Sequence, residues 1–197
     1  MSYEIIIQAL WIILPAYIAN ASAVLVGGGT PIDFGKKWKD GKRILGDGKT
    51  WRGLITGAIV GMAGGFGLSI VAIYANNSDF KFLGLSDFGQ FPLMIPMVGA
   101  ICFGALIGDI TESFFKRRVG KDRGEDWIPF DQLDFIVGAL VLSVVVAGII
   151  KIFNSYWFFE SFTIWHIFVL VILTPFFHIF ANFVHRRAHR SSSKESI

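Results

Sequence analysis

The sequence contains a single cysteine, Cys102, and it lies inside a long uncharged stretch. One cysteine cannot form an internal disulfide or a zinc site built from several thiolates, so both kinds of site are excluded. The amino-terminal segment also lacks a basic region, since it carries only Glu4 before the first apolar run. It shows no small-residue cleavage site either, and we therefore expect it to be a retained helix rather than a secretory signal.

Charge is scarce over most of the chain. Of the 197 residues, 53% are hydrophobic and 15% are aromatic, and the mean hydropathy of +0.58 is typical of an integral membrane protein. A helix needs about 20 mostly apolar residues to cross a bilayer. We therefore expect an all-α integral membrane protein, one domain over residues 1–197. About five transmembrane helices are predicted, over residues 5–32, 53–78, 88–115, 133–157 and 161–185.

Basic residues are concentrated in three segments of the chain. Sixteen of the eighteen Lys and Arg residues lie in residues 33–52, 109–134 and 186–197. Because basic connections remain on the cytoplasmic side of a membrane, these segments are predicted to face the cytoplasm. The N-terminus is then outside and the C-terminus inside, as in a multi-pass protein of the cell membrane.

The first basic loop, residues 33–52, has a pattern beyond its charge. An Asp-Gly pair precedes both Lys42 and Lys49, which suggests tight turns that present cations. The unit Gly46–Thr50 stands directly before the second apolar segment, where free N–H groups and Lys49 can meet a phosphate. The loop lacks the spacing of a P-loop. The alternative is a loop whose cations set topology and touch anionic lipid.

Small residues recur at a spacing of four in the second and third apolar segments. The members are Gly53, Gly57, Gly61 and Gly65 in one, and Ala100, Gly104 and Gly108 in the other. Such stripes allow neighbouring helices to approach closely. We interpret them as packing surfaces that answer one another within the chain or that meet a second copy.

Residues 108–134 hold seven of the fifteen acidic residues and five of the eighteen basic ones, between two apolar runs. If the third helix continues past Gly108, one helical face carries five polar side chains. These are Asp109, Glu112, Ser113, Lys116 and Arg117. Asp131 and Asp134 share a face at the start of the next helix. The pattern predicts two carboxylate-bearing helix ends at a shared site.

The chemistry of this set favours a hard cation. Carboxylates without thiols or a histidine cluster suit Mg²⁺ shared with substrate phosphates. The nearby cations, Lys116, Arg117, Arg118, Lys121 and Arg123, suit phosphate contacts, so the inventory indicates phosphoryl or nucleotidyl transfer. Two alternatives stay open. The charges can pair only with one another, or Asp109 and Asp134 can serve a small ion transporter.

The order of these motifs resembles a known family. The run Gly108-Asp109, Glu112-Ser113, Lys116-Arg117, Lys121-Asp122, Pro129 and Asp131-x-x-Asp134 is similar to the signature of the phosphatidate cytidylyltransferases. The first loop, with Pro31, Asp33, Gly41–Thr50 and Arg52, resembles the archaeal branch, the CDP-archaeol synthases. Trp127–Asp134 stands where bacterial and eukaryotic members have His-Gly-Gly-x-x-Asp-Arg-x-Asp, a departure that fits the archaeal branch.

The resemblance implies transfer of CMP from CTP to 2,3-bis-O-geranylgeranylglycerol 1-phosphate, with Mg²⁺ as cofactor and pyrophosphate as the second product. The expected partners are CTP, the ether-linked isoprenoid lipid phosphate and membrane lipid; nucleic acid is not expected, and a homo-oligomer is possible. The closest alternative enzyme is a CTP-dependent polyprenol or lipid kinase, which transfers the γ-phosphate. A CDP-alcohol phosphotransferase would require an Asp-Gly-x-x-Ala-Arg run, which the sequence lacks.

The resemblance also implies roles for individual residues. The catalytic set is Asp109, Glu112, Ser113, Lys116, Arg117, Asp131 and Asp134, of which Asp109, Asp131 and Asp134 hold the metal. The substrate-binding set is Asp33, Lys42, Arg43, Gly48, Lys49, Thr50, Arg52, Lys121 and Asp122.

Overall fold

The computed structural model describes residues 3–122, 125, 127–151 and 157–176. Over these residues the regular elements are helices joined by loops, and the β structure consists of two isolated bridges, which join Pro31 to Thr50 and Lys37 to Arg43. The labelled elements are α1 (Tyr3–Leu25), α2 (Trp51–Asn76), the 3₁₀ helix η1 (Asp79–Leu83), α3 (Met94–Arg118), α4 (Phe130–Lys151) and α5 (Trp157–Ser161). A further apolar helix spans Ile164–Phe176.

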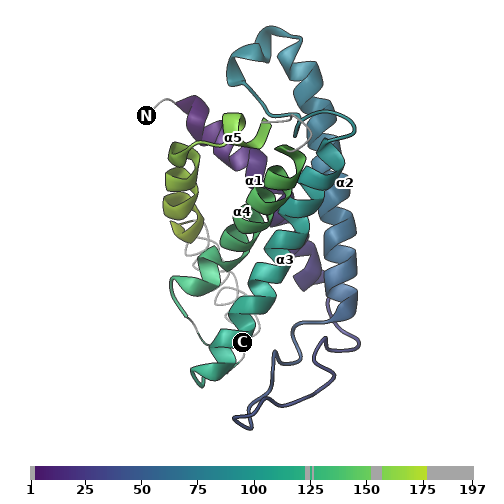
Figure 1. Cartoon of the computed structure of the whole chain (residues 1–197), viewed down its shortest axis with the longest axis vertical. Coiled ribbons are helices and arrows are strands. Elements are labelled where there is room, and N and C mark those ends of the chain that lie inside the picture. Colours follow the sequence, from purple (N-terminus) through teal and green to yellow (C-terminus); the bar gives the residue numbers. More distant parts are fainter. Residues whose placement is uncertain (1–2, 123–124, 126, 152–156, 177–197) are drawn as a thin grey trace, which may run out of the picture.

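Four helices, α1 to α4, are long and apolar enough to cross a membrane, and Figure 1 shows them as one elongated bundle. This confirms the predicted all-α membrane fold. The fifth predicted span is represented by the shorter helix Ile164–Phe176, and residues 177–185 of that span lie outside the described residues. The predicted orientation across the bilayer stays a prediction.

Two predicted spans began or ended in the wrong place. The helix expected over residues 5–32 ends at Leu25, because Gly28 and Gly29 have positive φ angles of 110° and 78°, which a right-handed helix does not contain. The helix expected to begin at residue 88 begins at Met94. Phe88 and Gln90, with φ of 61° each, belong to the turn before it.

The glycine stripe of α2 packs mainly on α1. A Cβ added at Gly53 would lie 2.9 Å from the carbonyl oxygen of Ala23, and one at Gly57 would lie 2.7 Å from that of Ala19. The first two glycines therefore let the α2 backbone lie directly on the α1 backbone.

The stripe of α3 meets a different partner. A Cβ at Gly104 would overlap the backbone of Gly138 in α4, and a Cβ at Gly108 would overlap the carbonyl oxygen of Asp134. The predicted packing partners, which the sequence left open, therefore lie within the chain and differ between the two stripes. Spacing identifies a surface for close approach but not the helix that covers it.

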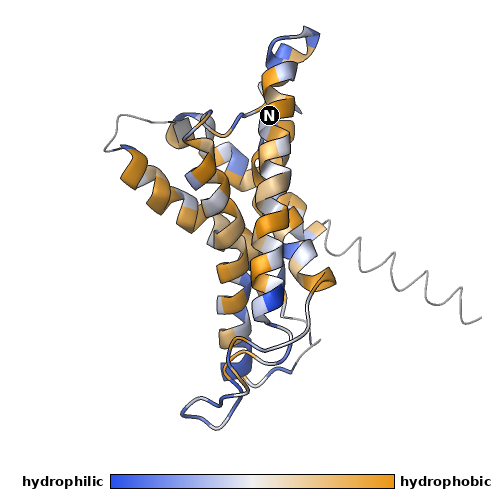
Figure 2. Cartoon of the chain, turned by 90° about the vertical axis from the view of Figure 1, so that its right-hand side faces the viewer, coloured by the Kyte–Doolittle hydropathy of each residue, from blue (hydrophilic) through white to orange (hydrophobic). Residues whose placement is uncertain are grey.

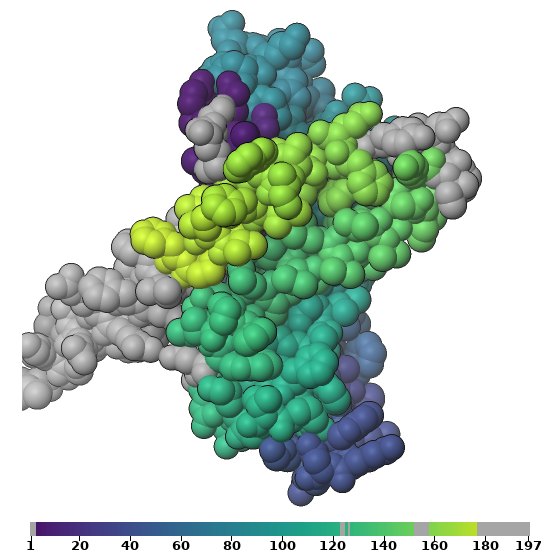
Figure 3. All heavy atoms as spheres, turned by 60° about the vertical axis from the view of Figure 1, so that its left-hand side comes forward, coloured from purple at the N-terminus to yellow at the C-terminus, as the bar shows by residue number. Residues whose placement is uncertain are grey.

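Polar residues gather at the two ends of the bundle (Figure 2). At one end residues 77–93 connect α2 to α3, and at the other residues 26–50 connect α1 to α2. The helix Ile164–Phe176 crosses α4 obliquely on one side of the molecule (Figure 3). The end that carries residues 26–50 also carries the C-terminal part of α3 and the start of α4 (Figure 1).

Candidate active site

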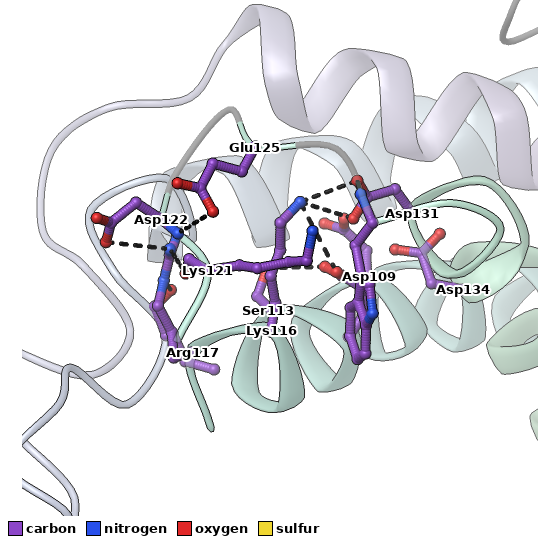
Figure 4. Close-up of polar contacts among 12 residues, drawn as sticks. Asp109, Ser113, Lys116, Arg117, Lys121, Asp122, Glu125, Asp131 and Asp134 are labelled. Carbon is purple, nitrogen blue, oxygen red and sulfur yellow. Dashed lines mark hydrogen bonds and ion pairs between the residues drawn. The ribbon is translucent and has the colours of Figure 1, made fainter. Parts of the chain in front are cut away.

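The predicted carboxylates meet where α3 crosses α4. Because Gly108 has no side chain, its backbone lies against the carbonyl of Asp134, and the next residue, Asp109, is brought beside the first turns of α4. Figure 4 shows Asp109, Asp131 and Asp134 gathered on the same side of the view. The glycine spacing thus determines which carboxylates come together.

Two lysines form ion pairs with this carboxylate group. Lys49 Nζ lies 2.6 Å from Asp109 Oδ2, and the two side chains are 22% and 20% exposed. Lys116 Nζ lies 2.7 and 2.9 Å from the two oxygens of Asp131. The backbone N–H of Trp127 also donates to Asp131 Oδ2 at 2.8 Å. Each pair joins different elements, so the loop 26–50 and helix α4 are both attached to α3 by charge.

Glu112 is more deeply buried than Asp109 and Asp131, whose side chains are each 20% exposed. Its side chain is 8% exposed and its Oε1 lies 4.0 Å from Lys116 Nζ. The Ser113 hydroxyl donates to Glu112 Oε2 at 3.4 Å, whereas Oε1 has no hydrogen-bond partner. A buried carboxylate oxygen that accepts no hydrogen bond is costly, so this atom fits a site that gains a partner when it is loaded.

The donor set fits a hard divalent cation. Asp109, Glu112, Asp131 and Asp134 supply only carboxylate oxygens, the ligands that Mg²⁺ prefers. Among the described residues no three acidic, histidine or cysteine side chains are yet close enough to hold a metal. The two lysines supply positive charge to Asp109 and Asp131 in this arrangement.

A second polar group lies toward the far end of α3, on the other side of Figure 4. It surrounds a cavity of about 360 Å³ lined by Lys42, Arg43, Gly46, Asp47, Arg117, Gly120, Lys121 and Asp122. No apolar side chain contributes to this lining. Four cations against two acids make it suited to a highly charged anion.

A narrower cavity of about 30 Å³ opens beside the Lys49–Asp109 pair, between α1, α2 and α3. Its polar members include Lys49, Asp109 and Thr50, and its walls are apolar. The wall residues include Ala23, Val24, Ile32, Leu54, Leu106 and Ile110. Val24 is 74% exposed at the end of α1, so the apolar wall continues to the surface.

Several residues predicted to bind substrate have hydrogen-bond partners within the protein, and their substrate-binding role stays a prediction. Thr50 is the N-cap of α2, and its hydroxyl accepts from Gly53 N at 3.1 Å. Arg52 Nε donates to the carbonyl of Val26 at 2.8 Å and so holds the end of α1. Gly48 lines the narrow cavity, whereas the side chain of Asp122 is 92% exposed.

Asp33, predicted to bind substrate, is surrounded by partners from its own loop. Its side chain is fully buried beside Arg43, and three backbone N–H groups, of Gly35, Leu45 and Gly46, donate to it at 3.0 to 3.1 Å. Burial by itself raises a carboxyl pKa. Here the Arg43 guanidinium and the three N–H groups outweigh it, and the pKa of Asp33 is held well below its usual value.

Arg118, which the sequence analysis named only as one of five cations suited to phosphate contacts, is an organising residue in the structure. Its guanidinium donates to the carbonyl of Arg43, its Nε lies 3.2 Å from Asp40, and it sits 4.9 Å above the ring of Phe114. Together with Arg117, which donates to the carbonyl of Leu45 at 3.3 Å, it joins the end of α3 to the loop. The sequence feature that could have indicated this role is the pair of adjacent arginines, Arg117 and Arg118, at the end of α3.

The fold and the site together define a membrane-embedded enzyme whose clustered carboxylates and cations lie at one end of a helical bundle. Over 90% of this chain and 94% of the other, its structure matches one described as an intramembrane enzyme for archaeal membrane lipids biosynthesis, with a TM-score of 0.70 and 34% identity.

Sequence comparison supplies the family. A family model described as CarS-like, CDP-archaeol synthase, matches residues 2–192. A CDP-archaeol synthase of Methanocorpusculum labreanum is 46% identical over 87% of this chain and 93% of its own. A CDP-archaeol synthase of Archaeoglobus fulgidus is 40% identical over 98% of this chain and 97% of its own. The chain belongs to the CDP-archaeol synthase family, which confirms the resemblance and the predicted enzyme class, a CTP-dependent cytidylyltransferase.

Proposed function

We propose that the enzyme transfers CMP from CTP to 2,3-bis-O-geranylgeranylglycerol 1-phosphate and releases pyrophosphate. The observation that carries this proposal is the meeting of carboxylates from α3 and α4 beside two cavities of different chemistry. One cavity is charged and open, the other has a cationic end and apolar walls. A reaction between a nucleotide and a lipid phosphate needs both kinds of cavity, a charged one for the nucleotide and an apolar one with a cation for the lipid phosphate.

The nucleotide is assigned to the cavity of about 360 Å³. A nucleoside triphosphate carries up to four negative charges, and the lining supplies Lys42, Arg43, Arg117 and Lys121. Arg117 is 13% exposed and is held by the carbonyls of Leu45 and Lys121. A guanidinium that is already oriented loses little freedom when it binds phosphate.

The lipid phosphate is assigned to the narrower cavity. Lys49, at the entrance to α2, would receive the phosphate, while Val24, Leu54 and Leu106 would contact the first carbons of the isoprenoid chains. The cavity holds only about 30 Å³ as it stands, so the Lys49–Asp109 pair must separate to admit the ligand. The ammonium then exchanges one anionic partner for another.

The reaction needs little proton transfer. The lipid phosphate is ionised near neutral pH, so one of its oxygens can attack the α-phosphate of CTP without a strong general base. A P–O bond forms at the α-phosphorus as the bond to the β-phosphate oxygen breaks, and pyrophosphate leaves. Lys116 and Arg117 are neighbours in the last turn of α3; Lys116 contacts Asp131 and Arg117 lines the charged cavity, and both would stabilise the charge that moves to the leaving group.

Mg²⁺ is the proposed cofactor. Asp109, Asp131 and Asp134 would hold it, with Glu112 as a further oxygen donor, and when bound it would neutralise phosphate charge. The proposed location of the active site is the cytoplasmic face, where CTP is available, as the clustering of basic residues supports. A homo-oligomer remains a prediction.

The test uses purified protein with CTP labelled separately at the α- and γ-phosphates, Mg²⁺ and the lipid phosphate. We expect the α label and cytidine on the lipid and the γ label in pyrophosphate. Transfer of the γ label to the lipid would instead identify a CTP-dependent lipid kinase. An unchanged rate after chelation of divalent cations would contradict the metal assignment.

A further inference from the structure

Asp33 has no free hydrogen-bonding capacity for a substrate. Its Oδ1 accepts from Arg43 Nη2 at 2.9 Å and from Gly35 N at 3.0 Å. Its Oδ2 accepts from Arg43 Nε at 3.3 Å, Leu45 N at 3.0 Å and Gly46 N at 3.1 Å. With a side chain that is 0% exposed, any influence of this carboxylate on the reaction must pass through the groups that it holds.

One group that Asp33 holds leads to the charged cavity. The backbone of Leu45 and Gly46 is fixed by Asp33 on its N–H side and offers the carbonyl of Leu45 to Arg117 Nε at 3.3 Å. Gly46 has φ of 96°, and a Cβ there would lie 3.3 Å from Arg117 Nε. The loop therefore lies directly on the guanidinium, and Asp33 fixes one of the two carbonyls that hold it, the other being that of Lys121.

The other group leads to Lys49. Only two residues separate Gly46 from Lys49, and Lys49 O accepts from Ile32 N, the neighbour of Asp33, at 2.8 Å. The adjacent bridge between Pro31 and Thr50 closes the loop at its base. The backbone of Lys49 is therefore linked to Asp33 in two ways, through Gly46 and through Ile32. The Lys49 ammonium lies 2.6 Å from Asp109.

We propose that Asp33 is a positioning residue that sets Arg117 and Lys49 in register, so that the nucleotide pocket and the lipid-phosphate pocket are aligned for transfer. This inference rests on the proposed function and assigns Asp33 no contact with substrate. An ionised carboxylate is required because all five of its partners donate. Asparagine has one acceptor oxygen and would turn its own N–H₂ group toward donors.

The test is Asp33→Asn, with Asp40→Asn as the matched control. Asp40 lies in the same loop, accepts from Lys42 N at 3.0 Å and pairs with Arg118 at 3.2 Å, but lines neither pocket. We expect Asp33→Asn to raise the KM for CTP at least tenfold, to lower kcat, and to weaken binding of CTP measured calorimetrically without lipid. Asp40→Asn should change each quantity less than twofold.

These measurements separate positioning from a merely structural role. A variant that only loses folded protein shows a lower kcat with unchanged KM for CTP, and that result would overturn the proposal. The ratio of variant to parent activity should be constant from pH 6 to 9, because the pKa of Asp33 lies far below this range. A ratio that changes with pH would contradict an indirect role.

A second variant covers the case in which Asp33→Asn does not fold. Arg43→Lys keeps the positive charge and the three backbone hydrogen bonds to Asp33 but removes the two-point contact with Asp33. Because Arg43 itself lines the nucleotide pocket, the readout for this variant is the KM for the lipid phosphate, whose pocket Arg43 does not line, and it should rise. An unchanged KM for the lipid phosphate in Arg43→Lys would count against the proposal. If the parent transfers no CMP at all, the proposed function fails before Asp33 is tested.

Discussion

The two ends of the bundle are held together by different kinds of contact. At the end with residues 77–93, neutral side chains donate to loop carbonyls: Gln8 to Leu83 at 3.2 Å, Trp11 to Ser86 at 2.9 Å and Asn76 to Leu85 at 2.8 Å. At the end with residues 26–50, the contacts include three ion pairs, Asp33 with Arg43, Lys49 with Asp109 and Lys116 with Asp131.

The difference follows from what each end must do. A neutral hydrogen bond contributes about 1 kcal/mol to stability and needs no exchange of partners. A partly buried ion pair carries a desolvation cost that makes it a poor choice for attachment alone. Such an ion pair suits a binding site, because a charged substrate can replace one of the two side chains while the other side chain is already oriented.

The largest expected effect is on the carboxylates themselves. Asp109→Asn removes a negative charge from the site and leaves Lys49 with a neutral partner, so we expect CMP transfer to fall by about 100- to 1,000-fold. The same change at the exposed Asp79, at the opposite end of the bundle, is the control. Near-normal transfer by Asp109→Asn would remove this residue from the metal-binding set.

Lys49→Ala tests the lysine of the narrow cavity. We expect kcat/KM for the lipid phosphate to fall roughly 10- to 100-fold, equivalent to about 1.4 to 2.7 kcal/mol of transition-state stabilisation. Lys81→Ala, in η1 at the other end, should leave the rate unchanged. Equal rates for the two variants would return Lys49 to a role in topology alone.

Gly108→Ala tests the helix crossing below the site. A methyl group there overlaps the Asp134 carbonyl, so α3 and α4 must separate, at a cost of about 1–3 kcal/mol. We expect a lower thermal unfolding temperature and weaker activity. In Gly99→Ala, on the same helix, the nearest atom to the new methyl is 3.9 Å away, and stability should stay the same or rise slightly.

Asp33 makes one part of stability depend on pH. Because its pKa is lower in the folded state than in the unfolded chain, its contribution is present above about pH 4 and disappears as the pH falls further. Thermal unfolding in detergent should therefore separate the parent from Asp33→Asn at pH 7. The difference between the two should begin to shrink as the pH falls below about 4, and it should disappear only well below pH 3. A constant difference over this range would show that the carboxylate charge is not the cause.

The smallest effect is expected at the neutral end. Trp11→Phe removes the hydrogen bond from the indole N–H to the carbonyl of Ser86 and should lower the free energy of unfolding by about 1 kcal/mol. Both KM values and kcat should remain within twofold of the parent. A large loss of activity would mean that the two ends of the bundle are coupled.

The sequence predicts the helices and the carboxylate group well because both depend on local spacing. Asp109 and Glu112 fall on one helical face whatever surrounds them, and the length of each apolar run predicts a span. Hydropathy alone did not locate the end of α1 at Leu25. Apolar and small residues continue past it, and the helix ends where glycine backbone angles change sign.

Contacts between distant residues could not be predicted in this way. The partner of each glycine stripe depends on which helices the connections bring side by side. The role of Asp33 depends on residues 10 to 13 positions away folding back over it. From the sequence, Asp33, Thr50 and Arg52 are polar residues in or near a cationic loop. Whether such a residue holds the loop together or binds substrate depends on its burial and its hydrogen-bond partners, and these are properties of the folded chain.

The glycine contacts also restrict the path of the lipid chains. Backbone lies against backbone where α1 meets α2 at Gly53 and Gly57, and where α3 meets α4 at Gly108, so neither seam has room for an isoprenoid tail. Beside the narrow cavity, the seam between α2 and α3 is filled instead by Leu54, Leu106 and Ile110. Aliphatic side chains can change rotamer and move apart, so under the proposed function we expect the lipid chains to enter from the bilayer along this seam.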